Sequence, residues 1–190
     1  MNDGIKKIEL SRLREETPRL FAGDSVSLTG TIYTARDAAH KRITEMLDRG
    51  EAPPFDISGA VIYYAGPTPA RPGQIIGSLG PTTSGRMDPY SERFLSMGLS
   101  GMIGKGDRRE DVCRAIEEHG AVYFIATGGA GALLSRCVRS CEVIAFDDLG
   151  CESVKRLYVE NFPAIVAIDA HGGNIYKTGR EKYREALSRL

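Results

Sequence analysis

The expectations for this chain start from one stretch, Gly80-Pro81-Thr82-Thr83-Ser84-Gly85-Arg86-Met87-Asp88. It combines hydroxyl groups, glycines that allow close approach to the backbone, and one arginine whose fork-shaped side chain pairs with anions. The apolar residues 75–79 before it are expected to form a strand, and residues 91–97 after it a helix. Such a loop suits a carboxylate or phosphate, although the stretch alone is equally consistent with a glycine-rich surface turn.

The composition limits the classes of protein to consider. The 190 residues are enough for one sizeable core, and no low-complexity linker divides them, so we expect one domain spanning residues 1–190. Equal numbers of basic and acidic residues, 25 of each, disfavour nucleic acid as a partner. The apolar runs are too short to cross a bilayer, and residues 1–7 lack the apolar core of a signal peptide. The default expectation is a cytoplasmic protein without membrane attachment.

The four cysteines show no pattern typical of a metal site. They are Cys113, Cys137, Cys141 and Cys151. No pair has the C-x-x-C spacing common in zinc and iron–sulfur sites, and Cys141 is expected to lie at the start of a strand. We therefore expect reduced, mostly buried thiols, and no metal or cluster ligated by this chain alone.

Predicted strands alternate with predicted helices for most of the length. Strands are expected at residues 5–10, 26–33, 60–64, 121–127 and 142–146, and helices at residues 11–20, 38–50, after Asp107 and through Leu133. Residues 121–127 are apolar on both faces, as in a central parallel strand. Further apolar segments at 154–159 and 164–169 lead to a turn at 171–174 and a polar tail. This order predicts an α/β fold with at least some parallel pairing.

Three cations follow predicted strands beside a glycine or a helix start: Arg36, Arg86 and Lys105. If these strand ends share one edge of the sheet, the cations converge on one crevice. Two arginines and a lysine would suit a substrate with two carboxylates. The alternative is that each is an ordinary solvated surface residue.

Two further segments, a strand-to-helix junction and a glycine-rich loop, contain residue types found in functional sites. Arg36, Asp37 and His40 fall at a strand-to-helix junction, where helical N–H groups point into a shared crevice in α/β folds. His40 could act in acid–base chemistry, or it could cap the helix and orient Arg36. The glycine-rich residues 128–131 also follow a strand, but they do not match G-x-G-x-x-G, and close helix–strand packing is the better explanation.

Five motifs, taken together, resemble a known family. They are Thr34-Ala35-Arg36-Asp37-Ala38-Ala39-His40, Tyr64-Ala65-Gly66-Pro67, the stretch from Gly80 to Asp88, Gly104-Lys105-Gly106, and Ala126-Thr127-Gly128-Gly129-Ala130-Gly131-Ala132. Their order and spacing look like the C-terminal domain, or separate β subunit, of the iron–sulfur class of fumarate hydratases and of the related L-tartrate dehydratases. The resemblance covers residues 5–176.

The resemblance implies a fold, a cofactor and partners. The fold is a single swivelling β/β/α domain with a mixed, partly parallel sheet. The cofactor is a [4Fe–4S] cluster whose three cysteines come from the other domain or the α subunit, and one cluster iron acts as a Lewis acid for the substrate hydroxyl. The implied partner is therefore a cluster-bearing α subunit, with two αβ units forming a dimer. This chain alone is expected to be inactive.

The resemblance also implies roles for individual residues. Thr82 matches the proposed proton-abstracting base, which needs activation by a carboxylate of the partner because a free threonine hydroxyl is a poor base. The residues implied to bind the substrate carboxylates are Arg36, Arg86 and Lys105. Further candidates at the same site are His40, Thr83 and Asp37.

The expected reaction is reversible hydration of fumarate to (S)-malate. The nearest alternative is the same chemistry on L(+)-tartrate, giving oxaloacetate, since both substrates carry two carboxylates. A non-catalytic carboxylate-binding or regulatory module is a second alternative, and a structural scaffold without a site is a third. The presence of Thr82 with all three cations argues against the last two.

Overall fold

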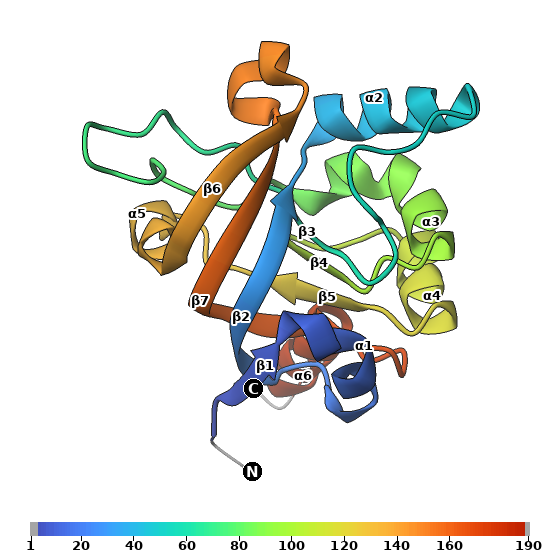
Figure 1. Ribbon diagram of the computed structural model, residues 1–190. Helices are drawn as coiled ribbons and strands as arrows, with labels where there is room; N and C mark the ends of the chain where they lie inside the picture. Colours follow the sequence, from blue (N-terminus) through green and yellow to red (C-terminus); the bar gives the residue numbers. More distant parts are fainter. Residues whose placement is uncertain (1–3, 189–190) are drawn as a thin grey trace.

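The computed structural model describes residues 4–188 (Figure 1). Its strands are β1 (Lys6–Glu9), β2 (Ser25–Thr34), β3 (Val61–Tyr63), β4 (Gly101–Gly104), β5 (Val122–Ile125), β6 (Val138–Ala145) and β7 (Val154–Ile168). Its helices are α1 (Leu13–Glu16), α2 (Asp37–Asp48), α3 (Asp88–Ser96), α4 (Glu110–Glu118), α5 (Gly131–Leu134) and α6 (Ile175–Leu187). The chain is therefore a mixed α/β protein, as the sequence predicts.

The strands form one mixed sheet in the order β1-β2-β3-β4-β5-β7-β6. Neighbours from β1 to β5 pair in parallel, whereas β7 runs antiparallel to β2, β5 and β6. The additional pairing between β2 and β7 closes β2, β3, β4, β5 and β7 into a ring. Because β2 to β5 are parallel, their carboxyl ends meet at one edge of the sheet, which we call the carboxyl edge.

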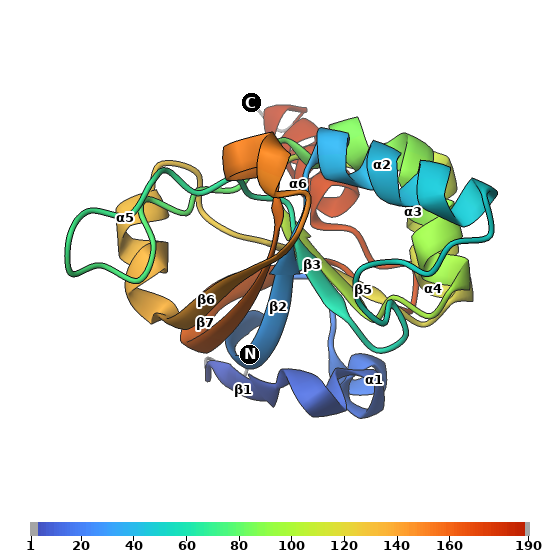
Figure 2. The same cartoon turned by 45° about the horizontal axis from the view of Figure 1, so that its top comes forward.

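An apolar cluster packs against each face of the sheet. One cluster fills the ring with residues such as Leu28, Ile103 and Phe124. The other lies beneath α2, α3 and α4, which cover the outer face of β3 to β5 in Figures 1 and 2, and includes Ile62 and Tyr123. Each large apolar side chain buried in this way contributes about 1.5–3 kcal/mol. The packed layers hold the strand ends, and hence the carboxyl edge, in fixed positions.

The strand expected at residues 75–79 is wrong. This segment belongs to an irregular loop, residues 66–80, which folds back on itself beside α5 in both views (Figures 1 and 2). Some of its backbone atoms form hydrogen bonds within the loop: the Ser78 N–H donates to Thr68 Oγ1. Others bond to side chains elsewhere: the Leu79 carbonyl accepts from the Tyr63 hydroxyl. The prolines and glycines of the loop disfavour a ladder partner, so an apolar run here does not become a strand.

Three other expectations need correction. Residues 11–20 form only the single turn α1 with flanking 3₁₀ turns. The apolar segments at 154–159 and 164–169 are two halves of one strand, β7, which continues through Asn161 with its positive φ of 52°. The polar tail is largely helical, as α6. In each case tertiary pairing, which local patterns do not reveal, decides the outcome.

Candidate functional site

The stretch from Gly80 to Asp88, here called the central loop, crosses the carboxyl edge between β3 and β4. Ala65 after β3 bridges Pro81, and Lys105 after β4 bridges Thr83. The Thr82 N–H donates to the Tyr64 carbonyl at 2.7 Å. The loop thus extends the sheet by a few residues, although no strand precedes it, and Arg86 lies in a 3₁₀ turn, Ser84–Met87, rather than at a strand end.

The two threonines of the loop present free hydroxyl groups. Thr82 is partly buried and Thr83 is exposed. Within residues 4–188, neither hydroxyl has a hydrogen-bond partner, although the backbone of both residues is tied down by the bridges to the strand ends. The backbone of Thr82 is therefore held in place, while its hydroxyl group remains available to a ligand.

Ser84 anchors the loop to β4 and β5. Its side chain is fully buried, and its hydroxyl accepts from the Lys105 N–H at 3.1 Å and bonds the Tyr123 hydroxyl at 2.8 Å. Tyr123 also bonds the Gly106 carbonyl, which can only accept, so the tyrosine proton goes there and Ser84 donates to Tyr123. Burial raises the pKa of Tyr123, which keeps that proton in place. The position facing Ser84 must be Gly104, because a Cβ there would lie 1.9 Å from Ser84 Oγ.

Arg36 and Arg86 share one carboxylate. Arg36 precedes α2, and its Nε lies 3.7 Å from Asp37 Oδ1; Arg86 Nη1 lies 3.8 Å from the other oxygen of Asp37. Arg36 also pairs with Glu152 at 3.2 Å. Arg36 Nε and Asp37 Oδ1 are nevertheless buried without a hydrogen bond among the described residues. The two guanidinium groups are thus brought together but incompletely satisfied, as expected where an anionic ligand could complete their hydrogen bonds.

Lys105 approaches the same loop from the other side. It is exposed at the end of β4, and within the described part of the chain its ammonium group makes no ion pair. Its backbone is bridged to Thr83, three residues before Arg86. The structure therefore places Arg36, Arg86 and Lys105 along the carboxyl edge, joined through Asp37 and the central loop.

His40 lies behind this group rather than within it. Its ring is buried against Tyr64, Tyr90 and Phe94, and Nδ1 lies 2.9 Å from the carbonyl of Arg36. Because that carbonyl only accepts, the neutral ring carries its proton on Nδ1. Burial lowers the pKa of His40 to about 4, so the ring is neutral near pH 7. This geometry favours the role of orienting Arg36 over acid–base chemistry.

The structure adds charged residues that the sequence reasoning missed. Glu152, which pairs with Arg36, comes from a 3₁₀ turn more than a hundred residues away along the chain. In the sequence, Asp88 stands out only as the last residue of the central loop, and Arg108 does not stand out, yet their side chains are 1% and 0% exposed. No local pattern marks such long-range pairs. The one available signal is that a buried charge needs a partner.

The cysteines and the second glycine-rich loop differ in detail from expectation. Cys113 is buried, Cys137 and Cys141 are partly buried, and Cys151 is exposed; Cys141 lies within β6 rather than at its start. In the region from residue 4 to 188, no group of three or more metal-ligating side chains was found. Gly131 packs against the start of the central loop, because a Cβ there would lie 2.9 Å from the Gly80 nitrogen. The glycine is thus explained by loop–loop rather than helix–strand packing.

The model of a family described as "Fumarase C-terminus" matches residues 1–179, and the chain belongs to that family. It is 41% identical over 183 residues to "Putative L(+)-tartrate dehydratase subunit beta" of Methanocaldococcus jannaschii, covering 93% of this chain and 94% of that protein. It is 39% identical over 172 residues to "Fumarate hydratase 2" of Leishmania major, and 37% over 170 residues to "Fumarate hydratase class I, aerobic" of Salmonella typhimurium.

The coverage of these relatives differs. The alignments with the two fumarate hydratases cover 90% and 88% of this chain, but only 30% and 29% of those proteins. The chain therefore spans nearly all of the archaeal relative and less than a third of the fumarate hydratases. The names of these three relatives all describe enzymes that add or remove water. No helix within the described residues is long and apolar enough to span a membrane.

Proposed function

We propose that this chain is the β subunit of an iron–sulfur hydro-lyase that reversibly hydrates fumarate to (S)-malate. The observation that carries the proposal is the grouping on the carboxyl edge: Arg36 and Arg86 flank one carboxylate, and the loop that carries Arg86 also carries Thr82 and bridges Lys105. Membership of the fumarase C-terminal family supports the same reaction class.

The cations bind the two carboxylates of the substrate in this proposal. The arginines bind in a forked, bidentate geometry, with the substrate replacing Asp37 as the partner of their N–H groups, and Lys105 acts as a point charge. Positive charge beside a carboxylate stabilises the negative charge that develops on it when the neighbouring carbon loses or awaits a proton. His40 holds the carbonyl of Arg36 and thereby orients that residue.

In this proposal, Thr82 removes or delivers the proton on the carbon next to the carboxylate. Its hydroxyl has no hydrogen-bond partner among residues 4–188, and its backbone is fixed by the bond to Tyr64. A threonine hydroxyl is a poor base, so the proposal assigns its activation to a carboxylate of the partner subunit. Thr83 and Asp37 border the same position and are the nearest further candidates.

The described residues do not fit a [4Fe–4S] cluster, because the cysteines are dispersed and no ligand set was found among residues 4–188. We therefore assign the cluster, and the chemistry at the substrate hydroxyl, to a separate α subunit. The exposed side chains of Thr83, Arg86 and Lys105 suit an edge that is completed by a second chain. The proposal also includes a single swivelling domain spanning residues 1–190, a cytoplasmic location and a dimer of αβ units.

L(+)-tartrate is the second candidate substrate. The specific observation in its favour is the relative named as a tartrate dehydratase β subunit, which this chain matches over 94% of that protein's length. Both diacids fit the same three cations. The difference lies in the second hydroxyl of tartrate, for which the part of the chain that the structure describes offers no distinctive partner.

The proposal is tested by purifying this chain anaerobically with its candidate cluster-bearing subunit. Fumarate hydration and tartrate dehydration are then measured for the complex and for each chain alone. We expect turnover of fumarate by the complex only. Turnover chiefly of tartrate would keep the mechanism and change the substrate. A chain that forms no complex, or a loaded complex that turns over neither acid, would contradict the catalytic proposal and favour a binding module.

A further inference from the structure

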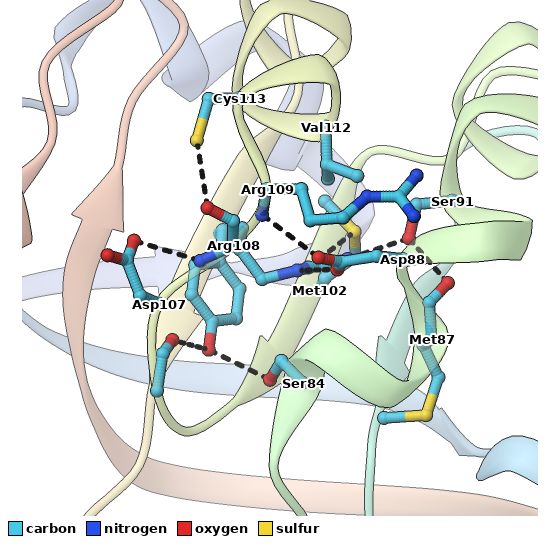
Figure 3. A network of polar contacts seen from close by, with 12 residues as sticks. Ser84, Met87, Asp88, Ser91, Met102, Asp107, Arg108, Arg109, Val112 and Cys113 are labelled. Carbon is cyan, nitrogen blue, oxygen red and sulfur yellow. Dashed lines mark hydrogen bonds and ion pairs between the residues drawn. The ribbon is translucent and has the colours of Figure 1, made fainter.

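A buried ion pair joins the two loops that carry the proposed substrate residues. Arg108 Nε donates to Asp88 Oδ1 at 2.6 Å, and the Arg109 N–H donates to the other oxygen of Asp88 at 2.9 Å (Figure 3). Arg108 Nη2 also donates to Ser91 Oγ at 2.6 Å. Asp88 is the last residue of the central loop and the first of α3, whereas Arg108 follows β4.

The guanidinium group of Arg108 also lies over two aromatic rings. Its central carbon is 5.5 Å from the ring centre of Tyr64 and 5.0 Å from that of Tyr123. Tyr64 accepts the Thr82 N–H on its carbonyl, and Tyr123 holds Ser84 and Gly106. Arg108 thus lies against two of the residues that fix the central loop to the strand ends.

We propose that Asp88 and Arg108 form a positioning clamp that sets Thr82 and Arg86 at the correct distance from Lys105. Asp88 lies two residues after Arg86, and Arg108 three residues after Lys105. Burying a charged pair yields little net stability, because the desolvation of both ions offsets their attraction. The geometry of this pair, in contrast, is well defined, because the guanidinium fork of Arg108 donates to both Asp88 and Ser91. The clamp touches no substrate and acts through the residues that do.

Kinetics on the assembled complex test the clamp, and this part of the test rests on the proposed function. We expect Asp88→Asn to lower kcat/KM about 100-fold, the cost of roughly 1 Å of misplacement, with KM raised and kcat lowered together. Arg108→Lys, which keeps the charge, should retain more activity than Arg108→Met. The matched control is Leu28→Ala, which truncates a fully buried side chain inside the ring; it should lower the Tm and leave kcat/KM within about twofold.

A double variant separates positioning from stability. Asp88→Asn combined with Arg108→Met removes both buried charges, so it should regain much of the Tm lost in Asp88→Asn alone. Its kcat/KM should stay low, because the forked link between the loops is still missing. Recovery of kcat/KM together with the Tm, or unchanged kinetics in the single variants, would overturn the clamp and leave a structural ion pair.

Amide hydrogen exchange on the full chain tests the clamp without any activity assay. Asp88→Asn should accelerate exchange at Thr82, Ser84 and Lys105, whose N–H groups bond across the loops, whereas Leu28→Ala should not do so selectively. Uniform acceleration over the whole chain would overturn the proposal. If the wild-type complex proves inactive while this local effect is seen, the proposed function fails and the clamp stands.

Discussion

At the residue scale, the candidate site depends on pairs that are distant in sequence. Thr82, Arg36, Arg86 and Lys105 could be selected from motifs, because each lies in a short pattern of glycine and hydroxyl residues beside a strand or helix. Their partners could not. The pairing of Arg36 with Glu152, for example, spans more than a hundred residues and depends entirely on how the strands fold.

His40 provides a prediction at this scale. Its pKa falls from 6.5 to about 4 in the folded chain, chiefly because burial disfavours the charged ring; nearby Arg108 lowers it further, and Asp37 opposes the shift. Between pH 6.5 and 4 the unfolded chain binds the proton and the folded chain does not, so stability falls as the pH falls. Across this pH range, the free energy of unfolding falls by about 3 kcal/mol because of His40.

Urea unfolding at a series of pH values measures this effect. The variant His40→Asn keeps a side-chain N–H for the Arg36 carbonyl but does not titrate. We expect its free energy of unfolding to decline less steeply than that of the wild type between pH 6.5 and 4, even though its absolute stability is lower. Parallel pH profiles for the two proteins would show that His40 is not buried in the neutral form.

At the element scale, the sequence predicted most of the strands and the three covering helices, because hydrophobic period and helix boundaries are local signals. These signals mislead at residues 75–79, where an apolar run bonds to its own loop, and along β7, where one strand looks like two separate apolar segments. Which segment pairs with which is a tertiary property. The closure of the ring by β2 and β7 could not be read from either strand alone.

Two glycines offer an opposed pair of predictions for these elements. Gly104→Ala places a Cβ at 1.9 Å from Ser84 Oγ, so the central loop must shift, and we expect a loss of about 1–3 kcal/mol. Gly179→Ala lies in α6 with open space around it, and should stabilise by about 0.5–1 kcal/mol. Thermal unfolding measures both. Equal effects in the two variants would contradict the tight packing at the end of β4.

At the scale of the whole molecule, the proposal treats one edge of the sheet as half of a site. The matched fumarate hydratases are more than three times as long as the segment that this chain covers, whereas the archaeal relative has nearly the same extent. The name of that relative as a β subunit supports the proposal of an enzyme divided into two subunits. In that proposal, this chain supplies the cationic half, and the partner supplies the cluster-bearing half.

The most direct measurement is therefore the turnover of the assembled complex with Thr82→Ala, compared with Thr82→Ser and the wild type. Removal of a group that transfers a proton in the transition state costs about 10²–10⁴-fold in rate. We expect kcat for Thr82→Ala to fall at least about 100-fold with little change in substrate affinity, because the three cations remain, and Thr82→Ser to retain part of the activity. A kcat for Thr82→Ala within about twofold of the wild type would contradict the central claim.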